Sequence, residues 1–426
     1  MQLADAPRLD MDVLQWSRHH RLFPGQGDFD LPAFLDQVLR TGYAGPLSLE
    51  VFNDVFRQAD PARTAVDALR SLLDLRERHA RRFGATDLLP RAPQLSGHAF
   101  AELAVAGDVL GQVEGALDAL GFARTGRHRS KPVQLWEQGT ARVVVNAAAA
   151  AGVAEIGAIA VESADPSRSR ERAEALLAPV LPRDRGIAEA DLAAVAAPDG
   201  TQVFFCRTGG GDSWLADFEP TGAVGPADTG LTHIDHVTLA QPFDAFDEAT
   251  LFYRSVLGLD PRDDIEYVAP YGVMRNRAVA DPDGRTRITL TGTLLRRGDW
   301  APAVPDPQHV AFATRDIVAT ARALRARGAP LLKIPDNYYD DLDARLAPPP
   351  QLLDSMREHG ILYDSDEAGE FFQVCTELIG SRVFFEVVQR VGGYRGVGAV
   401  SAPVRMAAHR RHRLATRPRA SGAREE

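Results

Sequence analysis

Three residues that lie far apart in the sequence have side chains suited to binding a metal ion. His236 lies in HIDHVTLA, His309 in QHVAFAT and Glu386 in RVFFEVVQR, and the apolar residues of these segments predict β-strands. A carboxylate inside an apolar strand is costly to bury alone, so Glu386 needs a cation nearby. Two imidazoles and one carboxylate form a facial triad, which leaves roughly three octahedral positions of a non-haem Fe(II) open for substrate and O₂. We therefore expect a divalent metal, Fe(II) first, although Zn²⁺, Mn²⁺ or Co²⁺ would also suit these ligands.

The alternation of side chains along a strand sets the direction in which each candidate ligand points. In HIDHVTLA it places Ile234, His236 and Thr238 on one face. It sends Asp235 to the opposite face, together with the valine and leucine that follow. In QHVAFAT the face of His309 carries two alanines, which leave room for a ligand beside the imidazole.

Another interpretation of the same residues needs no metal. His236 and His309 could be core histidines with ordinary hydrogen bonds, and Glu386 could form an ion pair with an arginine such as Arg382. Each histidine lies in the first strand of a repeated strand-helix unit, and Glu386 lies in the last strand. These positions favour the metal site.

The composition narrows the class of protein. The chain has 426 residues, a net charge of -10 and 45% hydrophobic residues, so we expect ordinary cores and neither a nucleic-acid nor a membrane partner. Cys206 and Cys375 are too far apart to form a metal-type motif, which fits a reducing, cytoplasmic location. A homo-oligomer remains compatible with the sequence. Only the stretch from Arg405 to Arg424 is locally basic, and it predicts a disordered tail.

The candidate ligands lie within an internal repeat. Four times after Gly97, a short strand leads into a helix and then into further strands, which predicts βαβββ units. The opening strands are AFAELAVAG near residue 99, EIGAIAVES near 155, HIDHVTLAQ near 233 and QHVAFATRD near 308. The predicted helices are Val109–Leu120, Arg170–Leu177, Ala249–Leu257 and Ile317–Arg327.

Four βαβββ units resemble the vicinal-oxygen-chelate superfamily, in which paired units curl their strands into a half-open barrel around a site. The resemblance implies an α+β chain with two such domains, preceded by the C-terminal fragment of a (β/α)₈ TIM barrel. The expected divisions are a barrel fragment at 1–83, a linker at 84–96, a domain without metal at 97–205, a crossover at 206–230, a metal-binding domain at 231–404 and the tail at 405–426.

The second half also resembles one family in particular. NYYDDL and the stretch LLDSMREHGILYDSDEAGEFFQVCTELIGSRVFFEVVQRVGG are similar to 4-hydroxyphenylpyruvate dioxygenases, as are the IDHV and QHVAF strands. This resemblance implies that His236, His309 and Glu386 are the iron ligands. It also implies that Gln373 in FFQVCT lines the substrate pocket. The first two units have no histidine at the equivalent strand position, so only the second domain should bind metal.

The sequence departs from this family at two places around the expected pocket. Thr291-Gly292-Thr293 stands where the family usually carries Asn-Glu-Pro, and Val397 stands where an aromatic residue packs on the substrate ring. Losing a large aromatic contact weakens selection for a phenyl ring. The metal is therefore predicted more firmly than the substrate.

The first eighty residues have a different, α/β rhythm. An amphipathic helix at 31–39, a strand at 47–52 and a second helix at 62–79 follow one another. QLADAP, WSRHHRLFPGQGDF and GYAGPLSLEVFNDVFR resemble the C-terminal end of the barrel of bacterial 3-dehydroshikimate dehydratases. Only the last two or three strands of a barrel are present, so this segment should be loosely held or packed against the second part.

By resemblance, four residues of the segment belong to a barrel active site. Gln2 and Glu50 correspond to ligands of Mg²⁺, Mn²⁺ or Co²⁺, and Ser17 and Arg21 to residues that bind the substrate. Arginine suits the recognition of a carboxylate. Without the resemblance, all four would be ordinary surface residues.

The order of segments resembles a fusion of the dehydratase barrel with a dioxygenase-like half, cut within the barrel. The first hypothesis is a fragment of a bifunctional dehydratase, which converts 3-dehydroshikimate to protocatechuate and retains a metal-dependent, dioxygenase-like domain. The second is a genuine Fe(II) dioxygenase of 2-oxo acids, and the third is a non-catalytic ligand-binding or scaffold module. In each case the expected partner is a small keto or hydroaromatic acid. The chain without the missing barrel strands should not dehydrate 3-dehydroshikimate.

Overall fold

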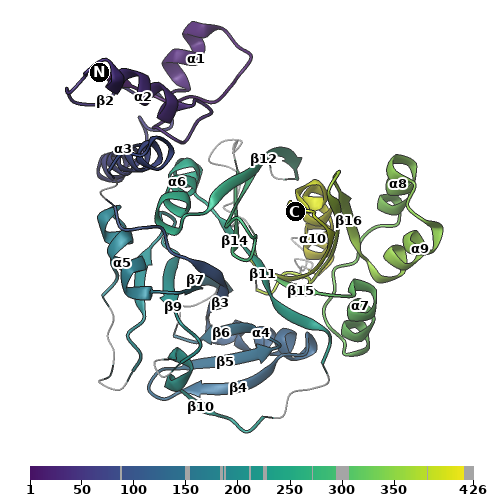
Figure 1. The fold of residues 1–426 in the computed structure, drawn as a ribbon. Coiled ribbons are helices and arrows are strands. Elements are labelled where there is room, and N and C mark those ends of the chain that lie inside the picture. The colour runs from purple at the N-terminus through teal and green to yellow at the C-terminus, as the bar shows by residue number, and fades with distance from the viewer. Residues whose placement is uncertain are drawn as a thin grey trace, which may run out of the picture.

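The fold consists of an N-terminal helical segment followed by two curled sheets (Figure 1). It is taken from a computed structural model. The structure describes residues 1–86, 89–148, 154–182, 186, 189–210, 213–223, 228–270, 272–293, 307–380 and 382–416.

The N-terminal segment contains two short parallel strands and three helices. Gln2 of the first strand is in register with Ser48 of the second, as expected for neighbouring strands of a barrel. Asp30 and Asp60 cap the second and third helices by accepting hydrogen bonds from backbone N–H groups, which fixes where these helices begin. The elements are β1 Gln2–Leu3, α1 Val13–His19, α2 Leu31–Arg40, β2 Ser48–Leu49 and α3 Pro61–Phe83.

The first sheet has the strand order β10-β4-β5-β6-β3-β7-β9-β8. Its neighbouring strands β3 and β7 are antiparallel, and each of these strands opens a repeat unit. The elements are β3 Leu95–Val105, α4 Gly107–Ala119, β4 Ala123–His128, β5 Val133–Gln138, β6 Ala141–Asn146, β7 Ala154–Ser163, α5 Pro166–Ala175, β8 Ala193–Ala196, β9 Gln202–Cys206, η1 Trp214–Asp217 and β10 Phe218–Pro220.

The second sheet repeats this plan with the order β12-β13-β14-β11-β15-β18-β17-β16. Its central strands β11 and β15 are antiparallel and carry the two candidate histidines. The elements are β11 Leu231–Ala240, η2 Phe243–Ala245, α6 Phe246–Leu257, β12 Asp260–Ala269, β13 Gly272–Ala280, β14 Arg287–Thr293, β15 Gln308–Thr314, α7 Ile317–Ala326, α8 Asn337–Leu346, α9 Pro350–His359, β16 Leu362–Ser365, β17 Gly369–Cys375, β18 Val383–Gly392, η3 Ala399–Ser401 and α10 Ala402–Thr416.

The predicted α+β architecture is confirmed, and so are the four strand-helix starts. The described part of the second unit is shorter than predicted, because only β8 and β9 follow α5 before the chain leaves for β10. The segment expected as a plain crossover at 206–230 contains η1 and β10. It is held there because Phe218 packs edge-on against His128 and Trp214, and β10 pairs with β4.

One apolar core joins the two sheets. Leu103 of β3 and Val237 of β11 are completely buried in the same cluster, which also includes residues of α4, α6 and α7. Phe122 of the first half contacts Phe312 of the second with ring centroids 4.8 Å apart. The two halves therefore fold against each other, and the site strand β11 is anchored from both sides.

The N-terminal segment packs against the second part of the chain through α3. The sequence predicted that this segment would be either loosely held or packed in this way. Arg172 of α5 donates to both carboxylate oxygens of Glu77 at 2.7 Å, and both side chains are almost completely buried. Arg254 of α6 donates to Asp74 at 2.7 Å. By contrast, Val13 of α1 and Phe34 of α2 are exposed.

The prediction of a disordered tail from residue 405 is wrong for the described part, which is helical to Thr416. Met406 of α10 packs against Met274 of β13. His409 lies against the ring of Phe384 and is hydrogen-bonded to the carbonyl of Thr376 at 2.9 Å. These buried contacts order a segment whose charge alone predicts disorder. Residues 417–426 lie outside the described part.

Candidate metal centre

The structure brings His236, His309 and Glu386 together at the middle of the second sheet. His236 Nε2 lies 3.2 Å from His309 Nε2 and 3.5 Å from Glu386 Oε2. His309 Nε2 lies 2.9 Å from the same carboxylate oxygen. All three side chains are almost completely buried. Among the described residues, this is the one group of three His, Cys, Asp or Glu side chains placed to hold a metal ion.

The strand pairing explains the convergence. β15 lies between β11 and β18, and Ala311 of β15 is in register with both His236 and Glu386. His309 lies two residues before Ala311 and on the same face. Residues that are distant in the sequence therefore project from three adjacent strands toward one point.

The distances fit a metal ion in a facial arrangement. Ligand atoms about 2.1 Å from a metal and at right angles to each other lie about 3.0 Å apart. The three observed separations fall between 2.9 and 3.5 Å. The alternative ion pair between Glu386 and Arg382 is wrong, because Arg382 pairs with Glu155 at 2.9 Å.

A β-bulge in β11 corrects one prediction. The register shifts between Ile234 and His236, so the alternation breaks at Asp235. Ile234 therefore joins the apolar core beside Val237, and not the face of His236. Asp235 is buried with its Oδ1 2.8 Å from His236 Nδ1. Strict alternation along the strand would turn this carboxylate away from His236, so the sequence alone does not predict its role.

Asp235 sets the tautomer of His236. A carboxylate only accepts hydrogen bonds, so Nδ1 of His236 carries the proton and Nε2 presents its lone pair to the centre. Arg390 donates to both oxygens of Asp235 at 2.8 Å, and Arg287 lies 3.2 Å from one of them. Burial acts to raise the pKa of Asp235, but Arg390 outweighs it and holds the pKa well below the usual value.

The electrostatics of the three ligands suit a cation. Burial lowers the pKa of His309 to about 4, so this imidazole is neutral at neutral pH. Burial opposes ionisation of Glu386 too, but His309 and His236 outweigh it and hold its pKa below the usual value. For His236, burial is outweighed by the hydrogen bonds with Asp235 and Glu386, which raise its pKa. A buried, ionised carboxylate beside two imidazole nitrogens is well prepared for a divalent metal.

Next to the triad, the concave face of the sheet carries an aromatic stack. Phe371 of β17 stacks on Tyr394 with centroids 5.1 Å apart, and both belong to a buried cluster with Ala311. Gln373 of β17 is buried, and its amide Nε2 donates to the carbonyl of Gly398 at 3.3 Å. The sequence singled out Gln373 but gave no signal for the stack.

The concave face of the first sheet is filled differently. Phe100 of β3, Phe204 of β9 and Trp214 of η1 form a buried aromatic cluster there. The first sheet thus has an apolar aromatic cluster, whereas the second has the polar triad.

The four candidate residues of the N-terminal segment lie apart from the metal centre. Arg21 Nη1 donates to the carbonyl of Glu50 at 3.0 Å and lies 3.8 Å from its carboxylate. Gln2 is on β1, beside the strand that precedes Glu50. Ser17 donates to a backbone carbonyl within α1. Within the described residues, Glu50 belongs to no group of three His, Cys, Asp or Glu side chains that could hold a metal ion.

Two family models match separate parts of the chain. Residues 1–73 match the xylose isomerase-like TIM barrel family. Residues 233–345, which include both histidines, match the glyoxalase/bleomycin resistance protein/dioxygenase superfamily. The second half is therefore a glyoxalase-type domain with the fold of a dioxygenase, attached to a barrel-type segment.

Curated relatives cover nearly the whole chain. It is 41% identical to 3-dehydroshikimate dehydratase of Pseudomonas aeruginosa, over 96% of this chain and 68% of that protein. The chain belongs to this family of 3-dehydroshikimate dehydratases, which is a family of enzymes. It is also 27% identical to 4-hydroxyphenylpyruvate dioxygenase of the same organism, over 66% of this chain and 84% of that one. Both predicted resemblances are confirmed.

Solved structures show the same combination of parts. A fusion protein of a xylose isomerase-like TIM barrel with 4-hydroxyphenylpyruvate dioxygenase superposes with a TM-score of 0.85 and 37% identity, over 97% of this chain and 69% of that one. A triple mutant of 4-hydroxymandelate synthase from Streptomyces coelicolor matches with a TM-score of 0.60 and 22% identity, over 75% of this chain and 99% of that one. The second match concerns the fold alone.

Proposed function

We propose that this chain takes part in the dehydration of 3-dehydroshikimate. We also propose that its second half binds one divalent metal ion at His236, His309 and Glu386. The relatives support the first part of the proposal. The second part depends on one observation, the convergence of three buried ligand atoms at 2.9 to 3.5 Å. Fe(II) is the ion that we expect, because a face of two imidazoles and a carboxylate is typical of non-haem iron sites.

The residues around the centre have separate tasks in this proposal. Asp235 holds the proton on Nδ1 of His236, and Arg390 keeps Asp235 ionised and in place. Gln373 offers a polar contact to an acid, and the Phe371–Tyr394 stack offers an apolar surface to its remainder. A bound Fe(II) would supply open coordination positions for two oxygens of that acid.

For the barrel segment we propose that Arg21 binds the carboxylate of the substrate and that Gln2 and Glu50 belong to a site for Mg²⁺, Mn²⁺ or Co²⁺. Because the described segment provides two of the strands of a barrel, we expect this chain alone to leave 3-dehydroshikimate unchanged. The ultraviolet absorbance of protocatechuate, followed with each metal in turn, measures this. Formation of protocatechuate by this chain alone would contradict the proposed need for further strands.

A second candidate function is the oxidation of a 2-oxo acid, and the aromatic stack beside the triad favours it. Oxygen consumption by the Fe(II)-loaded chain in the presence of 4-hydroxyphenylpyruvate tests this function, with the Glu386→Ala variant as the control. Uptake that requires both the acid and Glu386 supports a dioxygenase. Iron binding without any uptake supports a ligand-binding module that assists the dehydratase.

A further inference from the structure

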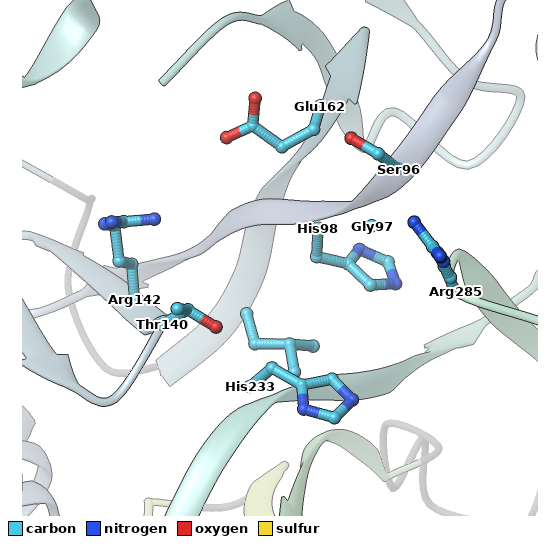
Figure 2. Close-up of a pocket in the computed structure, with 9 residues that line it drawn as sticks. Ser96, Gly97, His98, Thr140, Arg142, Glu162, His233 and Arg285 are labelled. Carbon is cyan, nitrogen blue, oxygen red and sulfur yellow. The ribbon is translucent and has the colours of Figure 1, made fainter. Parts of the chain in front are cut away.

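A cavity that is separate from the metal centre lies where the two sheets meet. Its volume is about 450 Å³, which is within the usual range for small-molecule sites. The first sheet contributes Ser96, Gly97 and His98 of β3 and Arg142 of β6. The second contributes His233 of β11 and Arg285 of the loop before β14. Figure 2 shows Arg142 on one side of this space and the ring of His98 beside Arg285 on the other.

The buried histidine of the cavity has an unused acceptor. His98 is 8% exposed, and its Nε2 lies 3.0 Å from the carbonyl oxygen of Arg287. A carbonyl only accepts, so Nε2 carries the proton. Burial lowers the pKa of His98 to about 4, so the ring is neutral and Nδ1 presents a lone pair. Nδ1 has no hydrogen-bond partner among the described residues, and a ligand with a hydroxyl donor would satisfy it.

The rim of the cavity offers positive charge. Arg285 is exposed and has no hydrogen bond or ion pair with any described residue. The backbone of Arg285 lies close to Gly97 in the cavity wall. A Cβ atom added to Gly97 would lie 3.7 Å from the carbonyl oxygen of Arg285. Arg142 uses Nε on Glu137 at 2.8 Å, which leaves its outer nitrogens for another partner. Two guanidinium groups are suited to bind a carboxylate.

The carboxylate that lines the cavity, Glu162, already has hydrogen-bond partners. Glu162 accepts hydrogen bonds from the backbone N–H of Thr208, at 3.0 Å, and from its hydroxyl. It therefore competes little for the arginines. The unused groups are thus a buried acceptor on one wall and guanidinium donors around it, and they require a ligand with a hydroxyl and an anionic group.

We propose that this cavity binds a small hydroxylated carboxylic acid with a single ring, in which a ring hydroxyl donates to His98 Nδ1 and the carboxylate pairs with Arg285. The cavity is distinct from the metal centre, because none of the three metal-binding side chains lines it. It does not depend on the proposed function, since no metal and no barrel residue takes part.

Isothermal titration calorimetry on the metal-free full chain tests the proposal, with 3,4-dihydroxybenzoate and shikimate as probes. Benzoate has the carboxylate without the hydroxyls, and catechol has the hydroxyls without the carboxylate. We expect at least one of the two probes to bind in a one-to-one ratio. We expect benzoate and catechol to bind at least about tenfold more weakly than the dihydroxybenzoate if that probe binds, because each lacks one required contact.

Variants at the rim separate this cavity from any other acid-binding place. Arg285→Glu should weaken binding by about tenfold or more, and Ser96→Trp should block it, whereas the exposed Arg322→Glu on α7 should have no effect. Arg285 and Ser96 are exposed, so these variants keep the fold. Absence of binding by both probes, or equal binding by the Arg285→Glu and Arg322→Glu proteins, would overturn the proposal. Loss of metal binding elsewhere in the chain leaves these outcomes unaffected.

Discussion

At the scale of single residues, the candidate metal centre depends on a carboxylate that does not itself contact the metal position. Asp235 fixes the proton of His236, and Arg390 and Arg287 compensate the buried charge of Asp235. Such partners of a ligating imidazole commonly control how well the ligand binds. The ligands thus form one buried ionic network with their neighbours.

We predict that Asp235→Asn weakens binding of Fe(II) or Co²⁺ by about 10- to 100-fold while all three ligands remain. An amide can donate to Nδ1, which would favour the tautomer with the proton on Nε2 and remove the lone pair from the metal position. Anaerobic competition against a chelator measures the dissociation constant. An unchanged constant would show that Asp235 does not position His236. Thr238→Val removes a hydroxyl that lies 3.0 Å from His309 Nε2 and leaves Asp235 intact, so it shows what a change beside the other imidazole does by itself.

The identities of the ligands could be predicted from the sequence, but not the complete site. His236, His309 and Glu386 carry a clear signal because polar side chains interrupt apolar strands. The role of Asp235 depends on a bulge, and a single extra residue in a strand leaves no mark in the pattern. Tyr394 lies in a loop after β18, so its stacking on Phe371 depends on the fold of the loop.

At the scale of elements, α3 connects the barrel segment to helices of both sheets, α5 and α6, through buried ion pairs. Breaking such a pair leaves an uncompensated charge, which costs more than the pair contributes. Glu77→Gln leaves Arg172 without its charged partner. We predict that this variant lowers the free energy of unfolding by about 3–5 kcal/mol.

The matched control for this prediction is Glu174→Gln. Its pair with Arg170 on α5 is exposed and should contribute less than about 1 kcal/mol. Denaturant unfolding of both variants provides the comparison. Equal effects would mean that α3 is not held by the Glu77 pair.

A second prediction at this scale concerns pH. Burial raises the pKa of Asp67 on α3 to about 7, and Glu248 on α6 adds to the shift. Arg70 opposes it, and Gln26 donates to Asp67 at 2.6 Å. A carboxyl whose pKa is raised on folding stabilises the fold below its unfolded pKa, and this contribution is lost as the pH rises toward the folded value.

We therefore predict that the chain loses on the order of 3 kcal/mol of stability between about pH 5 and about pH 8 through Asp67. Asp67→Asn should remove this part of the pH dependence. Urea unfolding at both pH values tests it. If wild type and variant lose stability in parallel, the carboxyl is already ionised at the lower pH.

Element boundaries could be predicted where local signals are strong. Helices α2 and α7 agree closely with the predicted ranges, because Asp30 and Asp316 cap their first turns. Helix α10 could not be predicted, since its basic sequence predicts a solvated tail. It is ordered by Met406 and His409, whose contacts on β13 and β18 are visible only in the folded chain.

At the scale of the whole molecule, the two curled sheets share one plan but have different concave faces. The first is filled by aromatic side chains around Trp214, and the second carries the triad. Every helix in the described part of the chain is too short or too polar to span a bilayer. The repeat explains why the overall architecture could be predicted from the sequence, since each unit begins with the same strand-helix pattern.

The central claim is that three distant side chains bind one cation, and the metal content of the protein tests it most directly. The chain is loaded with Fe(II) without oxygen, passed over a desalting column and analysed for iron. We predict one iron per chain for wild type and almost none for His309→Ala or Glu386→Ala, with the fold of each variant checked by circular dichroism. Folded variants that keep the iron of wild type, or a wild type that retains none, would contradict the account.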